Sequence, residues 1–219
     1  MAALKITIVL ADDEPATRAG IRTALEQTGE IDVVGEAQDG FEVQKLVEAL
    51  HPRVLLLDLK MPGPYENPVD LERWVREHCP DTATLPYTGH GREALLAQLM
   101  EAGAAGYLEK NTPLEKLVER IFSVAHGSTH FDPEQVEQAQ RWQDQVGNKW
   151  KSLSRREHEA ALWLARGATD RGMAGVLGIS ERTVESHVAN ILKKLDLETR
   201  AQVIAWVLRH FPEEVGGNW

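Results

Sequence analysis

The sequence predicts an α/β domain with a doubly wound, five-stranded parallel sheet, followed by an all-α domain. The first 126 residues alternate apolar, strand-like runs with amphipathic helical stretches, five times in succession. That alternation is typical of a parallel sheet covered by helices on both faces. From Leu153 onward only helical patterns occur. With 219 residues and 42% hydrophobic content, the chain can form two small domains, each with its own core.

The elements of the first domain follow from these patterns. Strands are expected at 5–10, 31–36, 53–58, 82–87 and 105–109. Helices are expected at 15–28, 40–50, 69–78, 91–102 and 113–126. Pro15 and Pro113 lie where prolines fit the first turn of a helix. Gly29, Gly103 and Gly127 directly follow helices, where a left-handed residue commonly ends the helix.

The second domain is expected to contain helices at 154–166, 170–177, 181–195 and 199–210. Gly167 and Gly178 follow the first two helices, and Ser180 is the expected N-cap of the third. We expect the last helix to stop before Pro212, which leaves 213–219 as a tail.

A polar, Gln-rich stretch, 127–150, separates the two domains and is expected to form a partly helical linker. Its Trp142 and Trp150 are expected to dock on a domain face, the alternative being a solvated connector. The expected domains are therefore 1–126 and 151–212.

Composition limits the classes of protein. The single Cys79 excludes an internal disulfide framework. No signal peptide or long apolar segment occurs, so a cytoplasmic protein is expected. Residues 149–219 hold 11 Lys and Arg against 9 Asp and Glu, a net charge of +2, whereas residues 1–148 carry −12. Without Glu213 and Glu214 the C-terminal value becomes +4. The charge therefore indicates an acidic module joined to a mildly basic one.

Polar residues stand where the expected strands end. Asp12 and Asp13 follow the first strand, Asp58 ends the third, Thr88 follows the fourth and Lys110 the fifth. In an open parallel sheet the carboxyl ends of the strands lie at one edge, which is where ligands bind. The carboxylates there can hold Mg²⁺, and Asp58 is the candidate nucleophile for a phosphoryl group. Thr88 and Lys110 can bind phosphoryl oxygens. A single Asp after a strand is most often a turn residue or helix cap, but five polar residues at one edge favour a site.

Residues 4–126 resemble the receiver domain of a two-component response regulator, which has a flavodoxin-like fold. The resemblance rests on Asp12-Asp13, Asp58 with Lys60-Met61-Pro62-Gly63, Thr88, and Tyr107-Leu108-Glu109-Lys110 followed by Pro113. It implies that Asp58 accepts a phosphoryl group from a phosphohistidine of a sensor kinase, with Thr88 and Lys110 binding its oxygens. It also implies a Mg²⁺ site formed by Asp13, Asp58, the Lys60 backbone carbonyl and, through water, Asp12. Tyr107 matches the aromatic switch of the family, although an ordinary half-buried strand aromatic is the alternative.

Two features depart from the receiver pattern. Pro62, Pro64 and Pro68 stiffen the loop after Asp58, because each proline restricts its own φ. Pro86 falls within the fourth strand, although proline cannot donate a hydrogen bond to a sheet. These departures put the dependence on phosphorylation in doubt. His90 stands where the family tunes dephosphorylation, or it is a surface loop residue.

The expected helix 181–195 has one apolar face, formed by Val184, Val188, Ile191, Leu192 and Leu195. Its other face carries Arg182, Glu185, Ser186, Ala189, Asn190 and Lys193. With the short helix before it and the turn Gly178-Ile179-Ser180, this pattern favours a helix-turn-helix, whose second helix enters the major groove. A helical bundle with a solvated charged face is the alternative from spacing alone.

Residues 152–210 resemble the LuxR-type helix-turn-helix domain found in NarL/FixJ-type response regulators. The matches are Leu153-Ser154-Arg155-Arg156-Glu157, Leu177-Gly178-Ile179-Ser180, Thr183-Val184-Glu185-Ser186-His187-Val188 and Ile191-Leu192-Lys193-Lys194-Leu195. The resemblance implies phosphate or groove contacts by Arg182, Thr183, His187, Lys193 and Lys194, and base-reading positions at Glu185, Ser186 and Ala189. It also implies dimerisation through the last helix, by Ala201, Ile204, Ala205 and Leu208. Gly172 departs from the pattern and costs roughly 0.5–1 kcal/mol relative to Ala.

The sequence thus predicts a DNA-binding transcription regulator, not an enzyme, controlled by phosphorylation of Asp58 with Mg²⁺. The small positive charge of the C-terminal domain predicts modest affinity per monomer, which pairing on a two-fold promoter site offsets. Two alternatives stay open. One is a phosphorylation-independent DNA-binding regulator whose receiver serves dimerisation or ligand sensing. The other is a Mg²⁺-dependent phosphotransfer enzyme, which the helix-turn-helix pattern disfavours.

Overall fold

The computed structural model describes residues 5–62, 67–89 and 93–216. The chain forms two compact units, Met1–Ala139 and Gln140–Trp219. The expected linker, 127–150, is therefore divided between them. Residues 63–66 of the proline-containing loop and His90 lie outside the described residues. None of the described helices is both long and apolar enough to span a membrane.

The first unit contains a five-stranded parallel sheet in the order β2-β1-β3-β4-β5. The strands are β1 (Ile6–Ala11), β2 (Ile31–Ala37), β3 (Val54–Leu57), β4 (Ala83–Thr88) and β5 (Leu108–Glu109). This arrangement confirms the predicted fold. The last strand is shorter than expected because Gly106, where a longer strand was predicted, pairs with His130 and not with β4.

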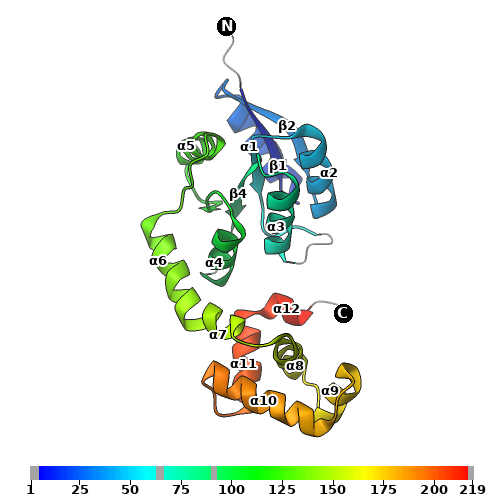
Figure 1. Ribbon diagram of the computed structural model, residues 1–219. Helices are drawn as coiled ribbons and strands as arrows, with labels where there is room; N and C mark the ends of the chain where they lie inside the picture. Colours follow the sequence, from blue (N-terminus) through cyan, green and yellow to red (C-terminus); the bar gives the residue numbers. More distant parts are fainter. Residues whose placement is uncertain (1–4, 63–66, 90–92, 217–219) are drawn as a thin grey trace. The chain divides into compact units, whose positions relative to one another are not determined.

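Helices cover both faces of the sheet, as the two sets of apolar residues on alternate strand positions require. They are α1 (Pro15–Glu26), α2 (Gly40–Leu50), α3 (Pro68–His78), α4 (Glu93–Ala102) and α5 (Leu114–Ala125). Ile8, Leu10 and Leu56 face one core with Leu25 of α1 and Ile121 of α5. Val9, Leu55 and Leu57 face the other core, with Val47 of α2 and Val75 of α3. Figure 1 shows α2 and α3 on one side of the sheet and α5 on the other.

Pro86 lies inside β4, paired with Leu57 of β3. The carbonyls of Thr84 and Thr88 both accept hydrogen bonds from the β5 side, from Ala105 N–H (2.9 Å) and Lys110 N–H (2.8 Å). Because N–H and C=O groups of alternate strand residues point to the same side, the missing N–H of Pro86 also falls on the β5 side. The proline therefore leaves the β3–β4 ladder intact. On the β5 side, the β4–β5 ladder has only two residue pairs.

The second unit contains the expected helices, α8 (Arg155–Ala165), α9 (Asp170–Leu177), α10 (Glu181–Leu195) and α11 (Arg200–His210). Each begins at a hydroxyl N-cap whose side chain accepts a backbone N–H, namely Ser154, Thr169, Ser180 and Thr199. A further helix, α12 (Pro212–Gly216), was not expected. Pro212 begins this helix and does not merely end α11, because proline also suits the first position of a helix.

The stretch between α5 and α8 is more helical than the linker we expected. It contains α6 (Pro133–Trp142), a π-helix η1 (Gln143–Gly147) and α7 (Asn148–Lys151), which follow one another without a break. Trp142 and Trp150 are buried in the second unit. The Trp150 ring stacks on Phe211 with 4.4 Å between centroids, and Trp142 meets the same ring edge-on at 5.9 Å.

Glu72 is a fully buried carboxyl group on α3, with 0% of its surface exposed. Neither of its carboxyl oxygens has a hydrogen-bond partner among the described residues. Burial raises the pKa of Glu72 to about 7, while the Thr84 hydroxyl and the Arg76 charge oppose this shift only in part. The native first unit therefore holds a proton on Glu72 that an unfolded chain has already lost at mildly acidic pH.

We expect the first unit to become less stable as pH rises, because the buried Glu72 then loses this proton. Between the ordinary carboxyl pKa of 4.5 and the raised value of about 7, the native state binds more protons than the unfolded state, so the free energy of unfolding falls. Urea denaturation at pH 5 and pH 8 should show a loss of up to about 3 kcal/mol that Glu72→Gln abolishes. Glu77→Gln, on the exposed side of α3, should leave the loss unchanged; an equal loss in the Glu72→Gln chain would contradict the prediction.

Candidate functional site

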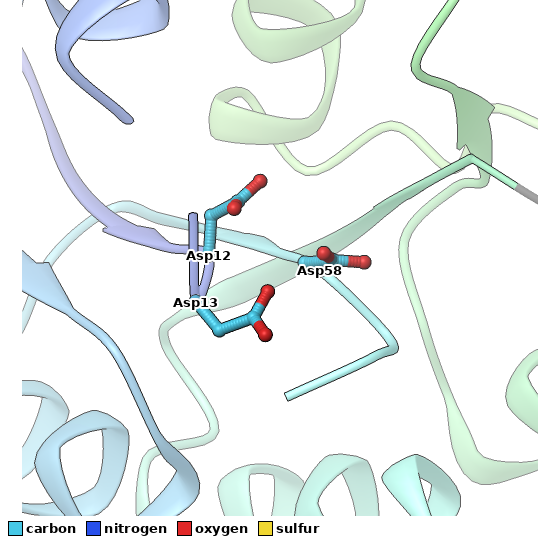
Figure 2. Close-up of side chains that lie close together, drawn as sticks. All are labelled: Asp12, Asp13 and Asp58. Carbon is cyan, nitrogen blue, oxygen red and sulfur yellow. The ribbon is translucent and has the colours of Figure 1, made fainter. Parts of the chain in front are cut away.

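Three carboxylates gather at the carboxyl ends of β1 and β3. Asp12 and Asp13 follow β1 directly, and Asp58 follows β3, with its N–H donating to the Ala11 carbonyl at 2.8 Å. One oxygen from each of the three carboxylates lies within 4.8 Å of the others. Figure 2 shows the three side chains together at this edge. The structure therefore brings together the carboxylates that sequence spacing predicted to meet.

Lys110 directly follows the edge strand β5, and its side chain reaches this cluster. Its Nζ donates to Asp12 Oδ2 at 2.6 Å and to Asp58 Oδ2 at 2.7 Å. Asp12 and Asp58 are buried, at 1% and 6% exposed, whereas Asp13 is exposed. Burial by itself lowers the pKa of Lys110, but the hydrogen bonds and charges of the two aspartates outweigh it and raise the pKa above its ordinary value.

Backbone groups orient the buried carboxylates. The Glu14 N–H donates to Asp12 Oδ1 at 2.8 Å, and the Lys60 N–H donates to Asp58 Oδ1 at 3.1 Å. The Lys60 backbone therefore lies beside the cluster. Arg18 of α1 donates from Nη1 to the Asp12 carbonyl at 2.5 Å, a contact that no sequence motif indicated.

The other strand ends supply the remaining predicted residues. Thr88 ends β4 and is buried, and its carbonyl accepts the Lys110 N–H. The Tyr87 hydroxyl donates to the Lys110 carbonyl at 3.0 Å, a contact that no sequence pattern indicated. Tyr107, the predicted switch residue, precedes β5 and is 3% exposed.

The chemistry of the cluster suits a hard divalent cation. Its donors are carboxylate oxygens, one of them from an exposed residue that solvent reaches, and Mg²⁺ prefers such oxygens together with retained water. Lys110 provides a point charge for an anion at the same place. Asp58 combines a buried carboxylate with this cationic neighbour.

In the second unit, a tight turn joins α9 to α10. Gly178 ends α9 in a left-handed conformation with φ of 66°, which glycine adopts without steric cost. Ser180 then begins α10, and its Oγ accepts the Thr183 N–H at 3.1 Å and bonds the Thr183 hydroxyl at 2.8 Å. The turn thus has the geometry expected of a helix-turn-helix.

The two faces of α10 differ as the sequence predicted. Val184, Val188, Ile191 and Leu195 are buried, and Leu192 is half-buried. The exposed residues include Arg182, Thr183, Glu185, Ser186, Ala189, Asn190 and Lys193. His187 is half-buried. The surface that α10 presents to solvent therefore holds most of the residues predicted to contact DNA.

Lys194 is held by the scaffold of the second unit. Its Nζ donates to Glu157 Oε2 at 2.7 Å and to the Ser152 carbonyl at 2.8 Å. Glu157 is buried, and the same carboxylate accepts the Ser154 N–H at 2.7 Å in a capping box. Burial would raise the pKa of Glu157, but the hydrogen bonds of Lys194 and Ser154 lower it overall. The Ser-x-x-Glu spacing was a signal for this capping role.

A second polar contact fixes α11 to α9. Arg200 binds the Asp170 carboxylate with both guanidinium nitrogens, at 2.6 and 2.7 Å. Val203 and Val207 of α11 are buried, whereas the outer positions Ala201, Ala205 and Leu208 are exposed and Ile204 is half-buried. The residues predicted to dimerise therefore share the outer face of α11.

Comparisons with known proteins assign a family to each of the two units. The sequence matches the family described as response regulator receiver domain over residues 8–122, and the luxR family of bacterial regulatory proteins over residues 151–207. The oxygen regulatory protein NreC of Staphylococcus carnosus is 32% identical over 210 residues, covering 92% of this chain and 96% of NreC. The chain is thus similar to a regulator along nearly its whole length.

Two solved structures are similar as well. The receiver domain of the response regulator NarL from Mycobacterium tuberculosis has 35% identity and a TM-score of 0.54, covering 57% of this chain and 98% of that one. RcsB from Salmonella enterica serovar Typhimurium, bound to a promoter in the presence of phosphomimetic BeF₃⁻, has 25% identity and a TM-score of 0.63. That match covers 93% of this chain and 98% of RcsB.

A receiver domain followed by a LuxR-type helix-turn-helix defines a class of transcription regulators, not of enzymes. This chain belongs to the NarL/FixJ-type two-component response regulators. It is therefore a DNA-binding response regulator, as the sequence predicted.

The position of Lys194 leads to a stability prediction. Lys194→Ala removes the partner of the buried Glu157 carboxylate, so the second unit should lose about 1–3 kcal/mol of unfolding free energy. The neighbouring Lys193→Ala, on the exposed face, should change it by less than about 0.5 kcal/mol. Urea denaturation followed by tryptophan fluorescence measures this unit well, because five of the six Trp residues lie after residue 140. Equal effects of the two substitutions would contradict the structural role of Lys194.

Proposed function

We propose that phosphorylation of Asp58 by a sensor histidine kinase controls the DNA binding of this regulator. The observation that carries the proposal is the Lys110 ammonium group bound to both Asp12 and Asp58, at 2.6 and 2.7 Å, at the strand ends of a receiver domain. In this arrangement the buried Asp58 carboxylate lies beside a cation that can bind an incoming phosphoryl group.

The transfer proceeds by attack of an Asp58 carboxylate oxygen on the phosphorus of a kinase phosphohistidine. The new O–P bond forms as the P–N bond breaks, and the histidine nitrogen keeps the electron pair. The phosphoryl group adds close to two negative charges at neutral pH. Lys110 then exchanges its hydrogen bond to Asp58 Oδ2 for one to a phosphoryl oxygen, and the Thr88 hydroxyl binds another.

Asp13, Asp58 and the Lys60 carbonyl would hold Mg²⁺, with Asp12 acting through water. The acidic cluster fits this ion, because its donors are carboxylate oxygens within 4.8 Å of one another. When bound, Mg²⁺ offsets the repulsion between the carboxylates and the phosphoryl oxygens. Tyr107 and Thr88 are the proposed switch residues, which change position together when the phosphoryl group binds.

The proposed output is promoter binding by α10 in a homodimer. Arg182, Thr183, His187 and Lys193 are the proposed phosphate or groove contacts, and Glu185, Ser186 and Ala189 occupy the base-reading positions. Lys194 would act chiefly through the fold of its unit. The outer face of α11 is the proposed contact between protomers, and the related RcsB structure on promoter DNA supports this output. We expect the protein to act in the cytoplasm.

The proposed division of labour assigns the receiver function to residues 1–126 and DNA binding to 151–212. Residues 127–150 connect the two functions, and 213–219 form a terminal segment. The family matches over 8–122 and 151–207 support this assignment.

Treatment with acetyl phosphate and Mg²⁺ should add one phosphoryl group to the chain, detected as an increase in intact mass. Asp58→Ala should abolish the addition, because the acceptor oxygen is lost. Asp70→Ala, which removes an exposed carboxylate on α3 paired with Arg73, should be labelled like the wild type. Labelling that persists in the Asp58→Ala chain would exclude Asp58 as the acceptor.

A second candidate function is DNA binding that does not depend on phosphorylation. Pro86 favours it, because this proline removes a hydrogen bond on the β5 side of β4, two residues before Thr88. Titration of promoter DNA with unphosphorylated and fully phosphorylated protein separates the two functions. Phosphorylation control predicts tighter binding and a shift from monomer to dimer mass after phosphorylation. Equal affinities and equal masses would favour the second candidate.

A further inference from the structure

The chain that leaves α5 lies against the start of β5. His130 N–H donates to the Ala105 carbonyl at 2.7 Å, and His130 forms a parallel bridge with Gly106. A Cβ atom on Gly106 would stand 2.7 Å from the His130 carbonyl oxygen, closer than real side chains come. The glycine is therefore required for this approach, so the contact is part of how the first unit is built.

The same segment is fixed to α5 at Asp132. Asp132 Oδ1 accepts from Arg120 Nη2 at 2.8 Å, and Oδ2 accepts from Lys116 Nζ at 3.4 Å. Arg120 also contacts the His130 ring. Asp132 directly precedes α6, and its carbonyl accepts the Val136 N–H at 3.1 Å. The segment that leads into α6 is thus held by α5 and by the backbone before β5.

Gln135 connects α6 to the switch residue. Its side-chain oxygen accepts the Asp132 N–H at 2.9 Å, which satisfies the free amide at the start of the helix. Its side-chain nitrogen donates to the Tyr107 carbonyl at 3.2 Å. One amide group therefore bonds the first turn of α6 and the backbone immediately before β5. We call these two hydrogen bonds the Gln135 bridge.

Apolar packing at the start of α6 is weak, so polar contacts determine its position. Val136 is 45% exposed. A cavity of about 510 Å³ lies beside the bridge, lined by Leu96 of α4, Tyr107, Lys116 and Gln138 among others. A helix start with few buried apolar contacts moves at low cost when a polar contact is lost.

The helix that begins at this bridge does not end in the first unit. Residues up to Ala139 belong to the first unit and those from Gln140 to the second. The backbone stays right-handed helical through α6, η1 and α7, with Trp142 and Gly147 both in the αR region. The later part of this helical run contributes Trp142, Val146 and Trp150 to the core of the second unit.

From these contacts we infer that Gln135 is a positioning residue that transmits the state of the receiver to the DNA-binding unit. A change in Tyr107 and β5 on phosphorylation alters the carbonyl that Gln135 binds, and with it the position of the first turn of α6. The continuous helical backbone carries that change to residues packed in the second unit. This inference rests on the proposed function, because it requires that phosphorylation changes DNA affinity.

The test compares the full-length wild-type chain with Gln135→Glu. A glutamate at this position still accepts the Asp132 N–H, and its charge suits the first turn of a helix. It has no N–H for the Tyr107 carbonyl, so only the link to the receiver is lost. DNA affinity is measured before and after phosphorylation with acetyl phosphate and Mg²⁺, on a duplex selected in vitro by the phosphorylated wild-type chain.

In the Gln135→Glu chain, the stimulation of DNA affinity by phosphorylation is expected to fall about fivefold, the equilibrium equivalent of one net hydrogen bond. The extent of Asp58 phosphorylation should stay unchanged. The matched control is Gln138→Glu, which adds the same charge to α6. The Gln138 side-chain nitrogen donates to Glu134 Oε1 at 3.3 Å, within the same helix. The Gln138→Glu chain should keep the wild-type stimulation.

Three results would overturn the inference. Full stimulation in Gln135→Glu would show that the bridge transmits nothing, while leaving the proposed function intact. Equal losses in Gln135→Glu and Gln138→Glu would assign the effect to charge and not to the hydrogen bond. If the wild-type chain binds DNA equally before and after complete phosphorylation, the proposed function itself fails and the inference fails with it.

Discussion

The receiver site depends on the two ion pairs that the Lys110 ammonium group forms with Asp12 and Asp58. Two buried carboxylates, Asp12 and Asp58, would repel each other at this edge of the sheet, and the cost of burying them unpaired is high. Lys110 offsets that cost by bonding both, at 2.6 and 2.7 Å, so it connects the ends of β1, β3 and β5. Any group that draws Lys110 away from Asp58 changes the charge balance at all three strand ends, which suits the proposed control by phosphorylation.

The strand that carries Lys110 also carries the contacts to the rest of the chain. β5 is only two residues long, and the backbone before it bonds the segment that leads into α6. β5 therefore forms only two residue pairs with β4, and the backbone directly before it also bonds the segment around α6. β5 contributes fewer residues to the cores than β3, where Val54, Leu55, Leu56 and Leu57 are all buried in one core or the other.

Some cationic side chains of the second unit stabilise its own fold, because they bond carboxylates within the unit. Lys194 lies on α10 and Arg200 begins α11, and both bond carboxylates of the unit, Glu157 and Asp170. These ion pairs connect α8 with α10 and α9 with α11. The cations on the exposed face of α10 remain few, which agrees with the small net charge of the C-terminal module and with the proposed pairing of domains on DNA.

The sequence by itself determined the order and type of nearly every element, because each carries its own signal. Short apolar runs such as 54–57 favour a buried strand, and hydroxyl caps such as Ser180 mark helix starts locally. It also predicted that Asp12, Asp13, Asp58, Thr88 and Lys110 lie at one sheet edge, since parallel strands end together. Only the tertiary structure decided which partner each polar side chain takes. Arg18, Tyr87 and Gln135 bond backbone carbonyls, and a carbonyl has no residue type to read in a sequence. Lys194 was predicted to meet DNA from the resemblance to LuxR-type domains, whereas its contact with Glu157 depends on how two helices pack. Long-range pairing of this kind follows from three-dimensional proximity, which local patterns do not contain.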